Sequence, residues 1–286
     1  MSASQVKLVM VMVDGFGVPP EGWGKSVYAE HCDRRFVELL AHHSVPLDAT
    51  LDVAGIPQSA TGQTALFTGV NAAAIMRSHL QGFPGPELRR LIAEDNIFAT
   101  LLRLGKKLAF ANAYVKYSLQ ELAHMRFRSV TTVMTEAALG FARALDSLLD
   151  GAAVYHDLTR DSICDEFRIP RIEPEEASRH LLGIAAQHDF TLFEYFLTDR
   201  AGHAGDKMFL EEVLGNLSRF ICEVVFSMPA NMLFALCSDH GNCEDTSTCS
   251  HTTNPVPFLF VGREPVDLRG LRSISDVSGF VVKTLS

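Results

Sequence analysis

The 286-residue sequence has few basic residues and no long hydrophobic run. Lysine and arginine together number 25, against 34 aspartates and glutamates, so the formal net charge is −9. The basic residues do not gather in a stripe, which argues against binding to a nucleic-acid backbone. The first apolar run, residues 8–13, is far shorter than the ~18–20 residues that span a membrane. We therefore expect no nucleic-acid or membrane partner and a cytoplasmic location.

Cysteine is also sparse, and no two cysteines are spaced as CxxC. Their spacing matches no zinc finger or ribbon, and a disulfide framework is not expected in a long intracellular chain. Cys243 and Cys249 flank a polar loop, where a thiolate-bound zinc is the alternative to free thiols. We predict free thiols at all six positions, Cys32, Cys164, Cys222, Cys237, Cys243 and Cys249.

Short β-rich runs alternate with helical patterns along the chain. This order is typical of a parallel sheet with helices on its faces. We predict an α/β fold, a three-layer sandwich around a mostly parallel central sheet. The expected strands are residues 6–13, 45–51, 107–113, 190–197, 233–237 and 258–261. The expected helices include residues 27–40, 87–104, 131–151, 175–186, 208–225 and 273–285.

The character of the sequence changes between Tyr114 and Gln187, where polar and linker-like stretches interrupt the alternation. We interpret residues 114–187 as a small cap inserted over the sheet edge. Residues 1–113 and 188–286 then form the core that carries the candidate site.

Acidic residues and histidines stand where several predicted strands end. The ends of strands in an α/β sheet gather at the rim where ligands bind. Each residue alone could be a turn, cap or surface residue, but the joint pattern favours a divalent-metal site, because such ions take histidine nitrogen and carboxylate oxygen. The candidate ligands are Asp14, Asp199, His203, Asp239, His240 and His251.

Ser59 follows a loop of small residues and precedes a helical pattern. A helix N-terminus offers free backbone N–H groups to an anion. The alternative is that Ser59 or Thr61 simply caps the helix.

Five segments of the sequence carry a family resemblance. Asp14-Gly15-Phe16-Gly17 resembles the DGxG that follows the first strand in the alkaline phosphatase superfamily. Asp199 to His203 resembles its D-x-x-x-H motif, and Ser59 falls where the nucleophilic serine stands. Residues 238–242, SDHGN, and residues 251–258, HTTNPVPF, are nearly identical to motifs of cofactor-independent phosphoglycerate mutase, one branch of this superfamily.

The resemblance implies two divalent ions, Mn²⁺ or Zn²⁺, and phosphoryl transfer through Ser59. One ion would be held by Asp14, Ser59, Asp239 and His240, and the other by Asp199, His203 and His251.

The mutase has a large phosphotransferase domain inserted after the helix that carries its nucleophile. The inserted segment of this chain is shorter and begins later. Ala60 and Gln63 replace a glutamate and a histidine of the mutase motif. We therefore expect hydrolysis of a phosphate monoester or diester of a small metabolite, with a phosphomutase acting on a sugar or sugar-acid phosphate as the alternative. A non-catalytic scaffold is disfavoured because the ligand set is complete. A sulfatase is disfavoured because Thr61 and Gln63 replace the proline and arginine of its motif. The candidate substrate-binding residues are Gln63, Arg126, Arg128 and Arg160, although the arginines could equally be solvated charges.

Overall fold

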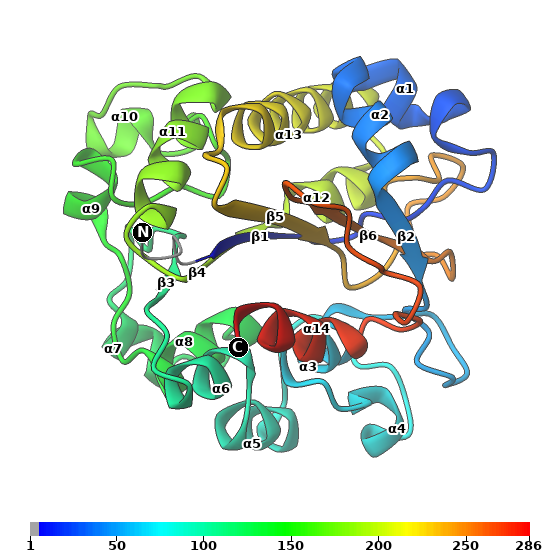
Figure 1. Cartoon of the computed structure of the whole chain (residues 1–286), viewed down its shortest axis with the longest axis horizontal. Helices are drawn as coiled ribbons and strands as arrows, with labels where there is room; N and C mark the ends of the chain where they lie inside the picture. Colours follow the sequence, from blue (N-terminus) through cyan, green and yellow to red (C-terminus); the bar gives the residue numbers. More distant parts are fainter. Residues whose placement is uncertain (1–5) are drawn as a thin grey trace.

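A six-stranded sheet lies between two layers of helices in the computed structural model, which describes residues 6–286 (Figure 1). The strand order is β2-β6-β5-β1-β4-β3, and β1 pairs in parallel with both β4 and β5. Strand β3 is parallel to β4, whereas β6 is antiparallel to β5 and β2. The predicted three-layer α/β fold is confirmed. The strands are β1 Lys7–Val13, β2 Ser44–Leu47, β3 Leu108–Phe110, β4 Phe190–Tyr195, β5 Met232–Cys237 and β6 Val256–Val261.

The side chains of β1 explain why both faces of the sheet carry helices. Leu8, Met10 and Met12 join the hydrophobic core on one face, whereas Val9 and Val11 join the core on the other. Successive side chains of a strand point to opposite faces. A strand that is apolar on both sides must therefore be covered on both sides.

The two helical layers provide this cover. Helix α13, Lys207–Ser227, packs against α11 in one layer, and α3, Ser59–Thr68, packs against α5 and α14 in the other. Within residues 6–286, no helix is both long and apolar enough to cross a membrane. The layer of α13 also holds α1 Val27–His31, α2 Arg34–His43, α11 Pro174–Ala185 and α12 Leu197–Ala204. The layer of α3 also holds α4 Ala72–Met76, α5 Pro86–Glu94, α6 Ile97–Arg103, α7 Leu119–His124, α8 Val130–Ala138 and α14 Asp276–Leu285.

Two predicted helices are interrupted by capping residues. Residues 27–40 form parts of α1 and α2, because Asp33 caps α2 by accepting a hydrogen bond from the backbone N–H two residues on, at 2.8 Å. Residues 87–104 form parts of α5 and α6, because Asn96 accepts a hydrogen bond from the backbone N–H three residues on, at 3.0 Å. A side chain that caps a helix satisfies donors that a continuous helix would use internally.

Residues 114–187 add helices to both layers. The prediction of one long helix over residues 131–151 is wrong, since the chain there forms α8 and the short helix α9, Leu145–Leu149. Gly140, between them, has a φ of 70°, a conformation that ends an α-helix. Helix α8 packs against α5 and α6, and α11 packs against α13. The division of the chain into a core and an inserted cap stays a prediction.

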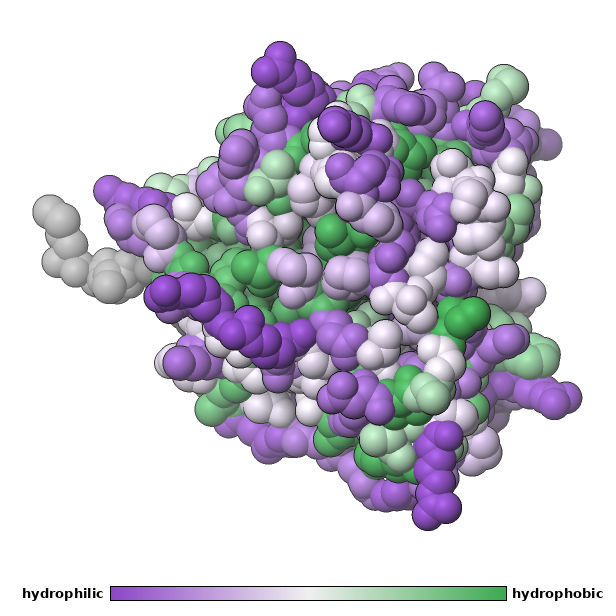
Figure 2. Space-filling model, turned by 90° about the vertical axis from the view of Figure 1, so that its right-hand side faces the viewer, coloured by the Kyte–Doolittle hydropathy of each residue, from purple (hydrophilic) through white to green (hydrophobic). Residues whose placement is uncertain are grey.

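Figure 2 views the side of the molecule toward which β1 and β5 run in Figure 1. Hydrophobic surface gathers left of the centre in this view, between strongly hydrophilic side chains. The carboxyl ends of the parallel strands face this side, and ligands of open α/β sheets bind at such ends.

Candidate metal centre

The predicted metal ligands gather at one rim of the sheet. Asp14 follows β1, Asp199 lies on α12 after β4, and Asp239 follows β5. His251 precedes β6, which runs antiparallel to β5, so it reaches the same rim. Donor atoms lie within 4.8 Å of one another in two groups, one of Asp14, Asp239 and His240 and one of Asp199, His240 and His251. The structure brings these side chains together, and their role as ligands stays a prediction.

His240 is the centre of the first group and is fully buried. Its Nε2 lies 3.1 Å from Asp14 Oδ1 and 3.6 Å from Asp239 Oδ2. Ser59 Oγ lies 3.0 Å from the same nitrogen. Ser59 is the first residue of α3, and the N-cap position belongs to Gln58. The alternative of Ser59 as a plain helix cap therefore does not hold, because its hydroxyl faces the candidate ligands.

The second group is Asp199, His240 and His251, and His203, which belongs to neither group, lies beside it. His251 Nε2 lies 3.2 Å from Asp199 Oδ1, and His203 Nε2 lies 3.5 Å from that oxygen. Asp199 and His203 are four residues apart on α12, so they share one face of the helix. Burial alone would raise the pKa of Asp199, but hydrogen bonds from His251 and Asn242 and the charge of His240 lower it to about 2. This carboxylate is therefore ionised at neutral pH.

All three histidines place Nδ1 against a backbone carbonyl. A carbonyl oxygen can only accept a hydrogen bond, so each Nδ1 carries a proton, and a ring that gives up its Nε2 proton turns the Nε2 lone pair toward the centre. Such carbonyl contacts orient histidines that bind metal ions. The pairs are His203 with Cys249 O at 2.7 Å, His251 with Pro57 O at 2.9 Å and His240 with Gly241 O at 3.3 Å.

The charge balance of the buried group fits a divalent cation. Asp14 Oδ1 and Asp239 Oδ2 are buried and have no hydrogen-bond partner. Burial, and then the charge of Asp239, raises the pKa of Asp14 well above its usual range. Burial would lower the pKa of His240, but Asp239 and Asp14 raise it to about 10. The two carboxylates thus hold a proton on the His240 ring at neutral pH, and a divalent cation would take the place of that positive charge. The nitrogen and oxygen donors of these side chains suit Mn²⁺ or Zn²⁺.

Glu244 organises the loop that joins the two groups. It is 3% exposed and accepts hydrogen bonds from the backbone N–H of Gly17 at 3.0 Å and of Asn242 at 2.7 Å. The side chains of Thr252 and Asn254 donate to it from the other end of the loop. Glu244 thereby ties the segment after β1 to both ends of the loop between His240 and His251.

Two glycines permit the close approach of these segments. A Cβ atom on Gly62 would lie 2.7 Å from the carbonyl oxygen of Asp239, so only glycine lets α3 bring Ser59 this close to β5. Gly15 has a φ of 67°, and a Cβ there would lie 2.9 Å from the Cα of Asp199. Both positions therefore require glycine for steric reasons.

The cysteines of this region are not arranged as ligands. Cys243 is buried, with its Sγ 3.5 Å from the Tyr28 hydroxyl, and Cys249 is exposed. All six cysteines are free, as the sequence predicts.

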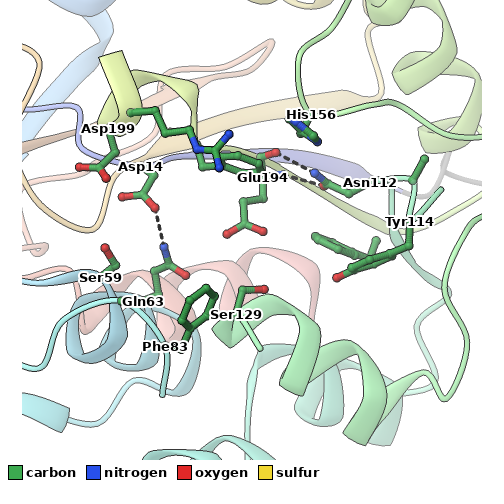
Figure 3. A pocket seen from close by; sticks show the side chains of 15 residues that line it. Asp14, Ser59, Gln63, Phe83, Asn112, Tyr114, Ser129, His156, Glu194 and Asp199 are labelled. Carbon is green, nitrogen blue, oxygen red and sulfur yellow. Dashed lines mark hydrogen bonds between the residues drawn. The ribbon is translucent and has the colours of Figure 1, made fainter. Parts of the chain in front are cut away.

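A cavity of about 400 Å³ opens beside Ser59 (Figure 3). Gln63 lines it and donates a hydrogen bond from Nε2 to Asp14 Oδ2 at 3.1 Å. The predicted substrate residue Gln63 therefore lies at the site. Other side chains that line the cavity are Phe83, Phe110, Asn112, Tyr114, Ser129, His156, Glu194, Phe196 and Arg200.

The three predicted arginines lie elsewhere, and within the described chain none lines this cavity. Arg128 pairs with Glu136 at 2.5 Å. Arg160 is buried and donates to the carbonyl of Leu148 at 2.8 Å. Arg126 is exposed. Arg200, the residue after Asp199, does line the cavity.

Sequence reasoning did not identify Arg200, Asn242, Glu244 or Glu194. Arg200 stands inside the D-x-x-x-H motif, and Asn242 belongs to the SDHGN motif, so their positions were a usable signal. Glu194 is the one charged residue in β4, FTLFEY, which is unusual for a buried strand.

Comparisons with known proteins indicate a metalloenzyme. A family model described as Metalloenzyme superfamily matches residues 170–286. The 2,3-bisphosphoglycerate-independent phosphoglycerate mutase of Cereibacter sphaeroides is 36% identical over 104 residues, which cover 32% of this chain and 20% of the mutase. The chain thus spans about a fifth of the length of the mutase that it matches.

Solved structures of alkaline phosphatases share the fold. The enzyme from the Antarctic bacterium TAB5 superposes with a TM-score of 0.58 at 12% identity, covering 99% of each chain. The enzyme from Thermus thermophilus gives a TM-score of 0.58 at 11% identity, covering 100% of this chain and 92% of the phosphatase. The family model, the mutase relatives and the common fold are each consistent with the alkaline phosphatase superfamily of metalloenzymes.

Proposed function

We propose that this protein hydrolyses a phosphate monoester or diester of a small metabolite, with Ser59 as the nucleophile. The observation that carries the proposal is the place of Ser59 Oγ, at the first turn of α3 and 3.0 Å from His240 Nε2. A serine hydroxyl among carboxylates and histidines that suit divalent ions is the arrangement that activates a serine for phosphoryl transfer.

Two divalent ions would be held by Asp14, Ser59, Asp239 and His240 and by Asp199, His203 and His251, and their charge would favour the Ser59 alkoxide and offset that of the phosphate. Ser59 Oγ attacks phosphorus, and the bond from phosphorus to the alcohol oxygen of the substrate breaks. The alcohol leaves with a proton from solvent, and a phosphoserine remains. Water then attacks phosphorus, which releases phosphate and restores the Ser59 hydroxyl.

Other residues of the chain would position the phosphate. The free N–H groups at the start of α3 attract phosphate oxygens. Arg200 lines the cavity beside Asp199. Its guanidinium can pair with a non-bridging oxygen of the phosphate, one that takes no part in the bonds formed and broken. Gln63, fixed by its hydrogen bond to Asp14, presents its amide to the same space.

Hydrolysis is preferred to a mutase reaction because of the residues around the cavity. A mutase must hold a second anionic group of its substrate while the phosphoryl group moves, and within the described chain Arg200 is the one arginine or lysine that lines the cavity. The phosphomutase stays the second candidate, because a curated phosphoglycerate mutase is 36% identical to this chain over 104 residues.

Product analysis separates the two reactions. The protein, loaded with Mn²⁺ or Zn²⁺, would be incubated with p-nitrophenyl phosphate, 3-phosphoglycerate and a pentose 1-phosphate, and followed by phosphorus NMR. We expect free phosphate. Isomer formation without free phosphate would support the mutase instead, and no turnover of any phosphate ester would contradict both.

A further inference from the structure

Glu194 is a buried carboxyl group that the mechanism above does not use. It is 7% exposed and projects from β4 into the cavity (Figure 3). Its Oε2 accepts a hydrogen bond from Thr131 Oγ1 at 2.5 Å. Asn112 fixes the Glu194 backbone with two hydrogen bonds of 2.8 Å. The side chain is therefore held in place by neighbours on two other elements.

Glu194 has no positively charged partner in the protein. No lysine, arginine or histidine among residues 6–286 forms an ion pair with it. Burial, opposed by the hydrogen bond from Thr131, raises the pKa of Glu194 to about 7. A buried charge without a partner is costly, so a cation brought by a ligand would be stabilised here.

Aromatic rings form much of the remaining wall. Phe110 and Tyr114 lie with ring centroids 6.2 Å apart, and Phe196 stacks on His156 at 4.6 Å. Burial lowers the pKa of His156 to about 4, so this ring is neutral at physiological pH. Aromatic faces attract ammonium groups, most strongly where water is excluded. A buried carboxyl group without a cationic partner and aromatic walls in one cavity favour the same kind of ligand.

We propose that this cavity binds the alcohol portion of the substrate and that this portion carries a protonated amine. The substrate class is then the phosphate esters of amino alcohols. The inference rests on the proposed function, because Ser59 and Glu194 line the same cavity and so would hold opposite ends of one substrate. A volume of about 400 Å³ is sufficient for a small ester of this kind.

Other substrate classes fit the cavity less well. A carboxylate at the same place, as in a phosphorylated sugar acid, would face Glu194 and be repelled. A neutral polyol could donate hydrogen bonds to Glu194 but would leave its charge uncompensated. Arg200, whose guanidinium lies 5.4 Å from the centre of the Phe196 ring, is available to the phosphate end of the ligand.

Three esters of nearly equal size test the inference on the metal-loaded protein. Ethanolamine phosphate carries an ammonium group, ethylene glycol monophosphate a hydroxyl group and phosphoglycolate a carboxylate. We expect kcat/KM to be at least about tenfold higher for the ammonium ester than for the hydroxyl ester, and lowest for the acid. Equal values for the first two, or a preference for the hydroxyl ester, would overturn the inference without needing any variant.

Glu194→Gln locates the preference. We expect the ratio of kcat/KM for the ammonium ester to that for the hydroxyl ester to fall at least about tenfold, whereas Glu264→Gln, an exposed site with the same charge change, keeps the wild-type ratio. An unchanged ratio in Glu194→Gln contradicts the assignment of Glu194.

Failure of the inference is distinguishable from failure of the proposed function. Turnover of p-nitrophenyl phosphate with no preference for the ammonium ester leaves the phosphatase proposal intact and removes the inference. If no ester is hydrolysed, the phosphatase proposal fails. Calorimetric titration of wild type and of Glu194→Gln, with ethanolamine phosphate and separately with ethylene glycol monophosphate, then decides the ligand class. Equal affinities of the wild type for the two esters would reject the preference for an ammonium group.

Discussion

His203 Nε2 lies 2.9 Å from His251 Nε2, while Nδ1 of each ring faces a backbone carbonyl. Both Nδ1 atoms must carry protons, so two neutral rings would direct two lone pairs at each other. Only a proton or a cation between them makes this arrangement favourable. Asp199 Oδ1, 3.2 Å from His251 Nε2, adds a negative charge to the same point. We propose that the two histidines are ligands of one metal ion, which would take the place of that proton.

The first prediction removes one member of this pair. We expect His251→Ala to lose about one metal ion per chain, because only Asp199 and His203 remain of three donors. The affinity for that metal ion should fall by at least about 10-fold. Elemental analysis after dialysis measures the stoichiometry. His42→Ala, an exposed histidine of α2, should keep the full metal content. Unchanged stoichiometry in His251→Ala would show that the ligand assignment is wrong.

The second prediction concerns the approach of α3 to β5. Gly62→Ala places a Cβ atom 2.7 Å from the carbonyl oxygen of Asp239, so the helix must move away from the strand. We expect a loss of about 1–3 kcal/mol in the free energy of unfolding, together with weaker metal binding because Ser59 and Asp239 separate. Urea unfolding and metal titration measure the two effects.

Gly183→Ala is the matched control for that experiment. Gly183 lies inside α11, and a Cβ atom there would meet no atom within 4 Å. Alanine is the better helix former by roughly 0.5–1 kcal/mol. We therefore expect this variant to be as stable as the wild type or more so. A similar response of the two variants would mean that the contact with Asp239 is unimportant.

The third prediction tests the carboxylate at the centre of the loop. Glu244→Ala leaves the N–H groups of Gly17 and Asn242 and the side chain of Asn254 without their acceptor. We expect the free energy of unfolding to fall by roughly 3–5 kcal/mol, because several buried donors lose a charged partner together. Denaturant unfolding provides the measurement. Glu264→Ala, at an exposed position, should change the free energy of unfolding by no more than about 0.5 kcal/mol. If Glu244→Ala changed it by as little, Glu244 would not be holding the loop in place.

The candidate ligands could be predicted from the sequence because each stands beside a strand end or in a short motif. Asp14 and Asp239 directly follow apolar runs, and the position of a strand end is set by local residue patterns. The antiparallel direction of β6, which brings His251 to the same rim, depends on sheet pairing and is not visible in a single run. The motif resemblance supplied that placement instead.

The walls of the cavity could not be predicted in this way. Glu194, Tyr114 and Arg200 come from β4, the segment after β3 and α12, and they meet only because the strands pair in this order. An arginine in a polar stretch is as often a solvated charge as a ligand for phosphate, and only tertiary contacts distinguish the two. Arg160, one of the candidate substrate-binding arginines, is instead buried and donates to the carbonyl of Leu148.

The fourth prediction addresses the nucleophile itself. Ser59→Ala removes the hydroxyl group that lies 3.0 Å from His240 Nε2 but leaves the six acidic and histidine ligands unchanged. We expect turnover of p-nitrophenyl phosphate to fall by about 10³-fold or more, because the hydroxyl group that forms the covalent intermediate is removed. Metal content by elemental analysis should stay near two ions per chain, since six of seven donors remain. Ser227→Ala, on the exposed end of α13, should retain wild-type turnover. Persistent turnover in Ser59→Ala, with metal bound, would mean that water attacks the phosphate directly and that the serine only completes the metal site.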